Sequence, residues 1–133
     1  MSAPITGLYA ALCALVLLGL AVRVSWVRRR AEIFLGDGGD PALQRAVRAH
    51  ANAAENMPLA LLLLLTVELA GTAGWLLHGA GIALVAGRIL HGWGLNRSAG
   101  ASFGRVAGMA LTWGTMGVLA GIALTAAAGL PLT

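Results

Sequence analysis

The sequence predicts an all-α integral membrane protein, a four-helix bundle with four transmembrane helices. Three observations support this fold class. First, 59% of the 133 residues are apolar and only 11% are charged, against about 25% charged residues in a soluble domain. Second, the mean hydropathy is +0.83. Third, the chain has room for four apolar segments of the roughly 20 residues that one span needs. We therefore expect a single domain over residues 1–133.

The first two helices are predicted from an apolar run and a turn. Residues 4–28 hold an apolar run that precedes an arginine cluster. A cleaved signal peptide has the opposite order, so we interpret this run as the first span. Asp40 and Pro41 suit the N-cap and first position of a second helix, expected at 41–70. Pro58 lies inside it and predicts a kink, because proline has no backbone N–H.

The last two helices are separated by a polar loop. The glycine-rich turn at 71–74 ends the second helix, and Trp75 is placed as an interfacial anchor at the start of the third. We expect the third helix at about 75–95 and the fourth at about 103–128. The fourth helix ends before a glycine and a proline, which terminate helices.

All nine basic residues are arginines, and they gather on one side of the predicted bundle. Residues 1–22 and 106–133 carry no charged side chain. The positive-inside rule therefore places the first and third loops in the cytoplasm and both termini on the opposite side. The patterning of a nucleic-acid module is absent, so we expect no nucleic-acid partner. The arginines are Arg23, Arg28, Arg29, Arg30, Arg45, Arg48, Arg88, Arg97 and Arg105.

The beginning of the second helix carries a polar stripe. At 100° per residue, four polar side chains fall within about 80° of arc on one face. Arg88 and His91 share a face of the third helix, and Arg105 begins the fourth at the same end. Guanidinium groups bind carboxylates in pairs of hydrogen bonds, and a carboxylate suits an ammonium. We predict a site for a peptide with several carboxylates beside an apolar co-substrate from the bilayer. The stripe consists of Arg45, Arg48, Asn52 and Glu55.

Structural roles are the alternative for several of these residues. Arginines at span ends commonly extend to lipid phosphates. Glu55 could simply pair with Arg48 or Arg88. Glu68 lies opposite the stripe and must be neutral or paired, across a subunit interface or with the fourth helix. Cys13 is expected to be a small core residue, and a single cysteine excludes an internal disulfide. We expect no metal site.

The segment RAHANAAENMPLALLLL resembles the helix-two signature of the MAPEG family, the membrane-associated proteins in eicosanoid and glutathione metabolism. The segment GRILHGWGLNRS resembles the helix-three motif of that family. Arg105 looks like its helix-four arginine, and Arg28 or Arg29 looks like its helix-one arginine. The likeness covers about residues 5–125. The helix-two positions that match are Arg48, Asn52, Glu55 and Pro58, with Arg45 similar to a further arginine of the leukotriene C synthase type.

The resemblance implies a homotrimer of a bacterial type, set among lipids of the inner membrane. It implies glutathione as co-substrate in a cytoplasm-facing cleft between neighbouring subunits, and a lipophilic small molecule as the electrophile. Arg105 would hold the thiolate for glutathione transfer or peroxide reduction. Arg28, Arg45 and Arg48 would hold carboxylates, Glu55 the γ-glutamyl ammonium and Asn52 a backbone group, with Arg88 and His91 in the same site.

Three positions depart from the family pattern. Ala51 stands where some members have an arginine, and Leu95 and Met109 stand where others have tyrosines. Two other functions are alternatives, and the missing tyrosines favour the first of them. One is a non-catalytic membrane subunit with this fold. The other is a small four-span transporter, in which Glu68 would be the proton-coupling group.

Overall fold

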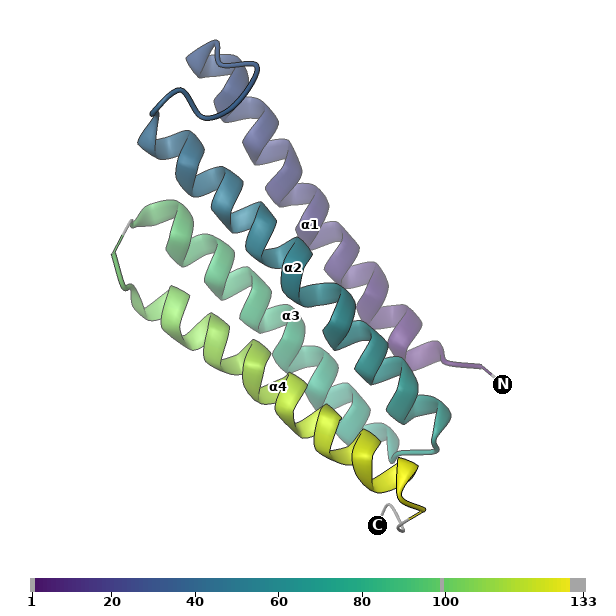
Figure 1. Cartoon of the computed structure of the whole chain (residues 1–133). Coiled ribbons are helices and arrows are strands. Elements are labelled where there is room, and N and C mark those ends of the chain that lie inside the picture. The colour runs from purple at the N-terminus through teal and green to yellow at the C-terminus, as the bar shows by residue number, and fades with distance from the viewer. Residues whose placement is uncertain (1, 99, 130–133) are drawn as a thin grey trace.

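A computed structural model of the chain describes residues 2–98 and 100–129. Neighbouring helices run antiparallel, so α1 begins and α4 ends at the same end of the bundle (Figure 1). We call this end, with the α2–α3 turn at 70–73, the termini end. The opposite end, with the loop at 32–40 and residues 98 and 100–102, is the arginine end. The helices are α1 (Pro4–Ala31), α2 (Pro41–Leu69), α3 (Gly74–Arg97) and α4 (Phe103–Ala127).

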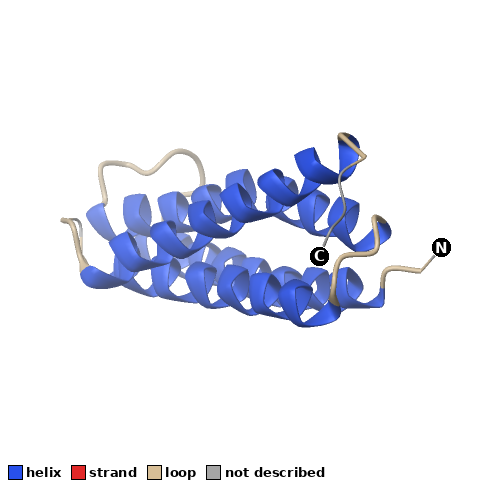
Figure 2. Cartoon of the chain, turned by 90° about the horizontal axis from the view of Figure 1, so that it is seen from below, coloured by secondary structure: helices blue, strands red, loops and turns tan. Residues whose placement is uncertain are grey.

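Three of the helices, α1, α2 and α4, are long and apolar enough to cross a membrane. The 24 residues of α3 span about 36 Å at the usual helical rise, so α3 has the same reach. It buries Arg88 and His91 inside the bundle and leaves Ile82 and Ile89 exposed on its outer side. Exposed apolar side chains of this kind suit a lipid environment. The described residues form helices joined by loops, with no strand among them (Figure 2). The predicted all-α membrane bundle is confirmed.

Two prolines of α2 were given roles from the sequence, and the N-cap beside Pro41 is the one that the contacts test. The Asp40 side chain accepts a hydrogen bond from the Leu43 backbone N–H at 2.7 Å, and Pro41 occupies the first turn. This N-cap is confirmed. Pro58 lies in the middle of α2, which continues as an α-helix to Leu69. The polar stripe and the apolar span therefore belong to one continuous element.

Glu68, near the end of α2, caps the beginning of α1. Ala3 at the N-cap of α1 has no side-chain acceptor. Instead, the two carboxylate oxygens of Glu68 accept hydrogen bonds from the backbone N–H groups of Ile5 at 2.9 Å and Thr6 at 2.6 Å. A negative charge is stabilising where a helix begins, because the first N–H groups lack partners there. The partner of Glu68 is thus α1, rather than the α4 partner that we had considered.

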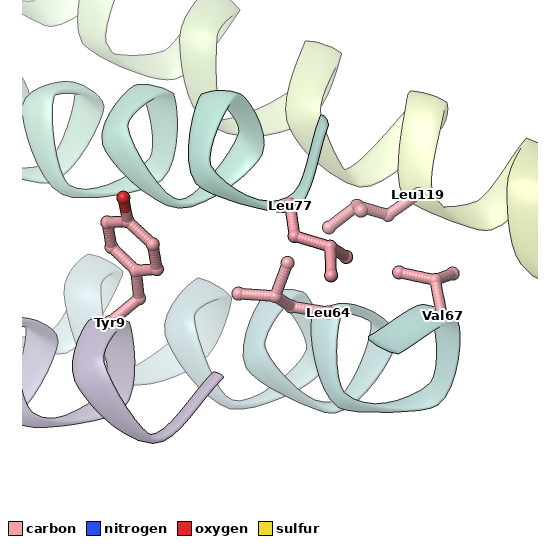
Figure 3. Packing of buried hydrophobic residues seen from close by; sticks show 5 residues of the cluster. All are labelled: Tyr9, Leu64, Val67, Leu77 and Leu119. Carbon is pink, nitrogen blue, oxygen red and sulfur yellow. The ribbon is translucent and has the colours of Figure 1, made fainter. Parts of the chain in front are cut away.

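The termini end has an apolar core to which all four helices contribute buried side chains (Figure 3). The Tyr9 ring packs against Gly81, where any side chain would clash with it. Its hydroxyl lies 3.0 Å from His78 Nδ1. Cys13 belongs to the next cluster and is 1% exposed, which confirms it as a core residue. The first cluster consists of Tyr9, Leu64, Val67, Leu77 and Leu119.

Helices α3 and α4 touch backbone to backbone along a glycine seam, formed by Gly87, Gly94, Gly104 and Gly108. A Cβ atom on Gly108 would lie 2.5 Å from the His91 backbone N and 2.6 Å from the Gly87 carbonyl oxygen. Small residues allow this close approach in membrane helices. The seam fixes His91 on α3 relative to Arg105 on α4.

Helices α2 and α3 lie at the middle of the bundle. Each contacts the other and both outer helices, whereas α1 and α4 make no contact with each other in the described residues. Polar side chains on α2, α3 and α4 can therefore share one space at the arginine end. Helix α1 contacts α2 and α3, and at the arginine end its Arg23 Nε donates to Asn96 Oδ1 of α3 at 2.8 Å.

Candidate functional site

A polar pocket of about 290 Å³ opens at the arginine end between α2, α3 and α4. Five predicted site residues meet there, from three helices. Arg48 is largely exposed and His91 is buried, so the pocket runs from the surface into the bundle. Arg45 has a buried Nε that lacks a hydrogen-bond partner in the described part of the chain. The pocket is lined by Gln44, Arg45, Arg48, Asn52, His91, Leu95 and Arg105.

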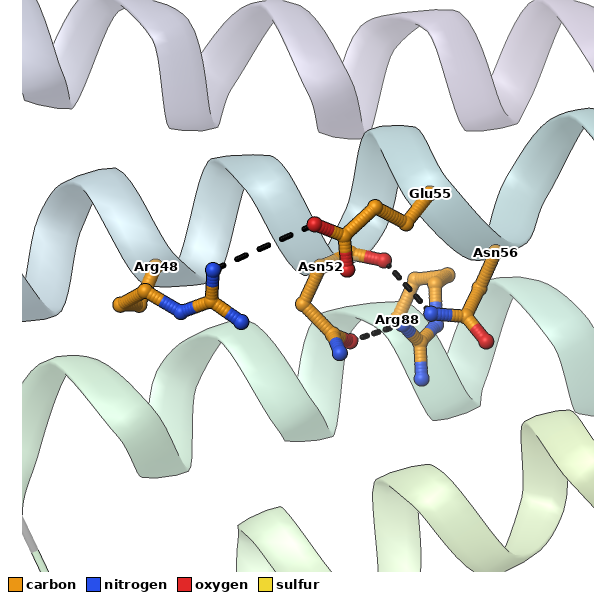
Figure 4. Close-up of polar contacts among 5 residues, drawn as sticks. All are labelled: Arg48, Asn52, Glu55, Asn56 and Arg88. Atoms are coloured by element: carbon orange, nitrogen blue, oxygen red, sulfur yellow. Dashed lines mark hydrogen bonds and ion pairs between the residues drawn. The ribbon is translucent and has the colours of Figure 1, made fainter.

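Arg88 lies outside the residues that line this pocket and is 1% exposed. Its Nη1 donates to Asn52 Oδ1 at 2.8 Å, which joins α3 to α2 (Figure 4). Its Nη2 donates to the Gly108 carbonyl at 3.3 Å, which joins α3 to α4. Arg88 thus ties the three helices together, whereas the resemblance had suggested a direct contact with the ligand.

Arg105 stands on the first turn of α4, where two contacts hold it. Its backbone N–H donates to the Ser102 hydroxyl at 3.4 Å, which caps the helix. Its Nη1 donates to the Gly100 carbonyl at 2.7 Å. The side chain is half-buried. Because the loop before α4 holds one edge of the guanidinium, the group is oriented before any ligand arrives.

An apolar pocket of about 410 Å³ adjoins the polar one, and the two share His91 and Arg105. Trp113 forms part of its wall and donates through Nε1 to Asn56 Oδ1 at 3.3 Å, which joins α4 to α2. A guanidinium and an imidazole therefore stand where a polar cavity meets an apolar one. The apolar pocket is lined by His91, Ala101, Arg105, Val106, Met109, Ala110 and Trp113.

Glu55 follows the stripe on α2 but lies outside the pocket lining. One of its oxygens is 4.0 Å from Arg48 Nη1, and both side chains are more than half exposed. Figure 4 shows the two side chains extended toward each other. Exposed ion pairs of this kind contribute little to stability, so Arg48 and Glu55 are available to exchange partners.

The structure separates the roles of the two arginines at the end of α1. Arg28 Nη1 donates to the Gly36 carbonyl at 2.6 Å and to the Ile33 carbonyl at 3.4 Å, so it holds the α1–α2 loop. Arg29 instead lines an outward groove of about 350 Å³ together with Ser25 and Trp26. In a single chain, neither arginine lines the polar pocket.

Among the pocket residues with a polar group in the side chain, Gln44 and Trp113 were not predicted from the sequence. Gln44 lies one turn before Arg48 on the same face of α2, so the helical periodicity contains the signal for it. Trp113 lies two turns after Arg105 on α4. No local feature of the sequence marks a tryptophan in the middle of a span as part of a cavity wall.

Comparisons with known proteins identify the family of the chain. The family model described as the MAPEG family matches residues 6–125. The chain is 40% identical to "Inner membrane protein YecN" of Escherichia coli strain K12 over 81 residues, 61% of this chain and 62% of that protein. The protein of the same name from E. coli O6:H1 strain CFT073 matches equally. The chain thus aligns with less than two thirds of these relatives. With the family model spanning all four helices, the chain belongs to the MAPEG family.

Proposed function

We propose that the chain is a membrane-bound glutathione transferase or peroxidase. The observation that carries this proposal is the meeting of the polar and apolar pockets at His91 and Arg105. A water-soluble thiol in the first pocket and a lipophilic acceptor in the second would bring their reacting atoms together beside these two side chains. Holding two reactants in this way replaces an encounter in solution.

Arg105 is proposed to stabilise the thiolate of glutathione. A thiolate is the reactive nucleophile, and a nearby guanidinium favours it over the thiol. The thiol proton passes to water. In transfer, the sulfur bonds to an electrophilic carbon, and the leaving group departs from that carbon with the electron pair. In peroxide reduction, the sulfur takes one oxygen, the O–O bond breaks, the other oxygen leaves as an alcohol after protonation, and a second glutathione reduces the resulting sulfenic acid to the disulfide and water. The Gly100 carbonyl already holds Nη1 of Arg105, so little reorientation of the guanidinium is needed when negative charge develops on sulfur.

The remaining pocket residues suit the polar parts of glutathione. Arg45 and Arg48 offer donors to its carboxylates, and Asn52 offers one to a peptide group. Glu55 would exchange its exposed pairing with Arg48 for the γ-glutamyl ammonium. His91, at the boundary of the two pockets, would hydrogen-bond the peptide.

A homotrimer with glutathione between subunits is part of the proposal. Arg29, rather than Arg28, is the helix-one arginine proposed to reach a neighbour's site, because loop carbonyls hold Arg28. We also propose that the arginine end faces the cytoplasm, by the positive-inside rule. The related protein bears the name inner membrane protein, which supports a bacterial inner membrane as the location.

A non-catalytic subunit with the same fold is the second candidate. Leu95 lines the polar pocket and Met109 lines the apolar one, so neither pocket has a tyrosine hydroxyl in the described residues. A transporter has less support. Glu68, its proposed proton-coupling group, accepts hydrogen bonds through both oxygens from the beginning of α1.

Thiolate absorbance of glutathione, titrated into detergent-solubilised protein, tests the proposal. The wild type should bind at millimolar concentration and show a thiolate signal. Arg105→Ala should lose most of that signal, and binding should weaken roughly tenfold or more, as expected for hydrogen bonds to a charged group. Arg105→Lys should retain part of it.

Arg97→Ala is the matched control, because Arg97 lies at the same end but stacks on Trp93 at 4.6 Å and lies outside both pockets. It should behave as the wild type. A wild type that binds no glutathione would exclude the transferase. Binding without an Arg105-dependent thiolate would indicate the non-catalytic subunit.

A further inference from the structure

Arg88 is a cation buried in the middle of α3 without an acidic partner. It is 1% exposed, and the one salt bridge in the described residues joins Arg48 to Glu55. Its partners are instead neutral acceptors: Asn52 Oδ1 at 2.8 Å, and the Gly108 carbonyl and Met109 Sδ at 3.3 Å each. A buried charge persists only where hydrogen bonds compensate its lost hydration. The Asn52 oxygen is therefore a structural requirement of Arg88.

This contact determines which end of the Asn52 amide faces the pocket. A guanidinium has donors only, so the amide atom turned toward Arg88 must be the carbonyl oxygen. The opposite orientation would set an NH2 group against N–H donors and leave both without acceptors. Asn52 also lines the polar pocket. Because Arg88 occupies the side-chain oxygen of Asn52, the group that Asn52 can offer to a ligand is its NH2.

The charged side chains that line the polar pocket beside Asn52 are also hydrogen-bond donors. Arg45 and Arg48 on α2 and Arg105 on α4 carry donors only. Arg88 also holds the Gly108 carbonyl, three residues after Arg105 on the same helix. A single buried residue thus acts on both sides of the pocket, although it does not line the pocket itself.

We propose that Arg88 is a positioning residue that makes Asn52 a hydrogen-bond donor, so that the wall formed by Arg45, Arg48, Asn52 and Arg105 selects ligand groups that only accept. Carboxylate, carbonyl and thiolate groups satisfy this wall, and amide N–H or ammonium groups do not. This inference rests on the proposed function, and it assigns Arg88 no contact with the ligand.

The pairing itself is tested without ligand, from thermal midpoints of Asn52→Asp, Arg88→Met and the double variant. An aspartate in place of Asn52 still presents an acceptor to Arg88, so it should leave the midpoint unchanged or raise it. In the Arg88→Met background the same change leaves a half-buried carboxylate without its donor and should lower the midpoint. Equal effects in both backgrounds would overturn the inference. If Arg88→Met does not fold, the neutral variant Arg88→Gln takes its place. Asn52→Asp should again lower the midpoint in that background, because the cation that compensates the carboxylate is gone.

The consequence for the ligand is tested with glutathione. Asn52→Asp should weaken glutathione binding about tenfold or more, because the introduced carboxylate oxygen would then face an acceptor group of glutathione. The protein should stay as stable as the wild type. Asn56→Asp is the matched control, since Asn56 is on the next turn of α2 and outside the polar pocket. It adds the same charge and should change glutathione affinity much less. If both variants weakened glutathione binding equally, the added negative charge alone would explain the loss, and the inference would be contradicted.

A double-mutant cycle separates positioning from direct contact. If Arg88 acts through Asn52, Arg88→Met should lower glutathione affinity in the wild type but have little further effect on an Asn52→Ala background. Additive losses would mean that Arg88 acts on the ligand independently, which overturns the proposal. Failure of the wild type to bind glutathione would instead defeat the proposed function, and the thermal cycle would still decide the Arg88–Asn52 pairing.

Discussion

At the termini end of the bundle the polar groups pair with one another, whereas at the arginine end several cations surround a pocket. At the termini end, Glu68 accepts from two backbone N–H groups of α1, and the Tyr9 hydroxyl meets His78 at 3.0 Å. At the arginine end, Arg45, Arg48 and Arg105 surround an open pocket and Glu55 is the acid that pairs with one of them. Polar groups that satisfy one another stabilise the fold. An excess of cations around a cavity instead suits an anionic ligand.

We therefore predict that stability depends mainly on residues at the termini end and ligand binding on residues at the arginine end. Substitutions at the termini end should lower stability and leave the pocket intact. Substitutions on the pocket wall should weaken binding with little effect on stability. The glycine seam is the exception, because it supports the fold and also positions His91 and Arg105.

The largest effect is expected for Gly108→Val, which breaks the seam. A Cβ atom at this position meets backbone atoms of His91 and Gly87 at 2.5 and 2.6 Å, and backbone cannot move aside as a side chain can. The loss of stability should exceed the about 1–3 kcal/mol typical of overpacking. Gly114→Val is the control on the same helix, where a Cβ meets nothing within 4 Å. Thermal midpoints in detergent measure both, and similar midpoints would show that the seam is not tightly packed.

An intermediate effect is expected for Glu68→Ala at the termini end. The variant leaves the N–H groups of Ile5 and Thr6 without their acceptor. Removal of a helix cap costs about 0.5–2 kcal/mol, and faster hydrogen exchange in the first turn of α1 should accompany the loss. Glutathione affinity should not change. Glu68→Gln keeps one acceptor and should lie between the two. An altered glutathione affinity in Glu68→Ala would show that the two ends do not act independently.

The smallest effect on stability is expected for Glu55→Ala at the arginine end. Its ion pair with Arg48 is 4.0 Å long and largely exposed, so the free energy of unfolding should fall by less than about 1 kcal/mol. Glutathione affinity should nevertheless fall, since the variant removes the proposed partner of the ligand's ammonium. Glu55→Gln tests whether charge or shape matters. Unchanged affinity in both variants would remove Glu55 from the proposed site.

Local sequence signals predicted the helices well, because each has a local physical cause. Asp40 and Pro41 begin α2 as expected, since an N-cap depends on residues that are adjacent in the chain. The stripe of Arg45, Arg48 and Asn52 follows from helical periodicity, and all three line one pocket. Periodicity states which face a residue occupies. It does not state how far its side chain reaches, and Glu55, on the same face, lies outside the pocket lining.

The sequence by itself determined a membrane bundle of four helices with its arginines at one end, because hydropathy, caps and helical period act over a few residues. Only the tertiary structure decided how distant polar groups pair. It joined Glu68 to the beginning of α1, more than 60 positions away, and Arg88 to Asn52 across two helices. It also assigned Arg28 to the loop and left Arg29 exposed on the outer side of α1. These pairings depend on how helices pack side by side, which no local pattern encodes.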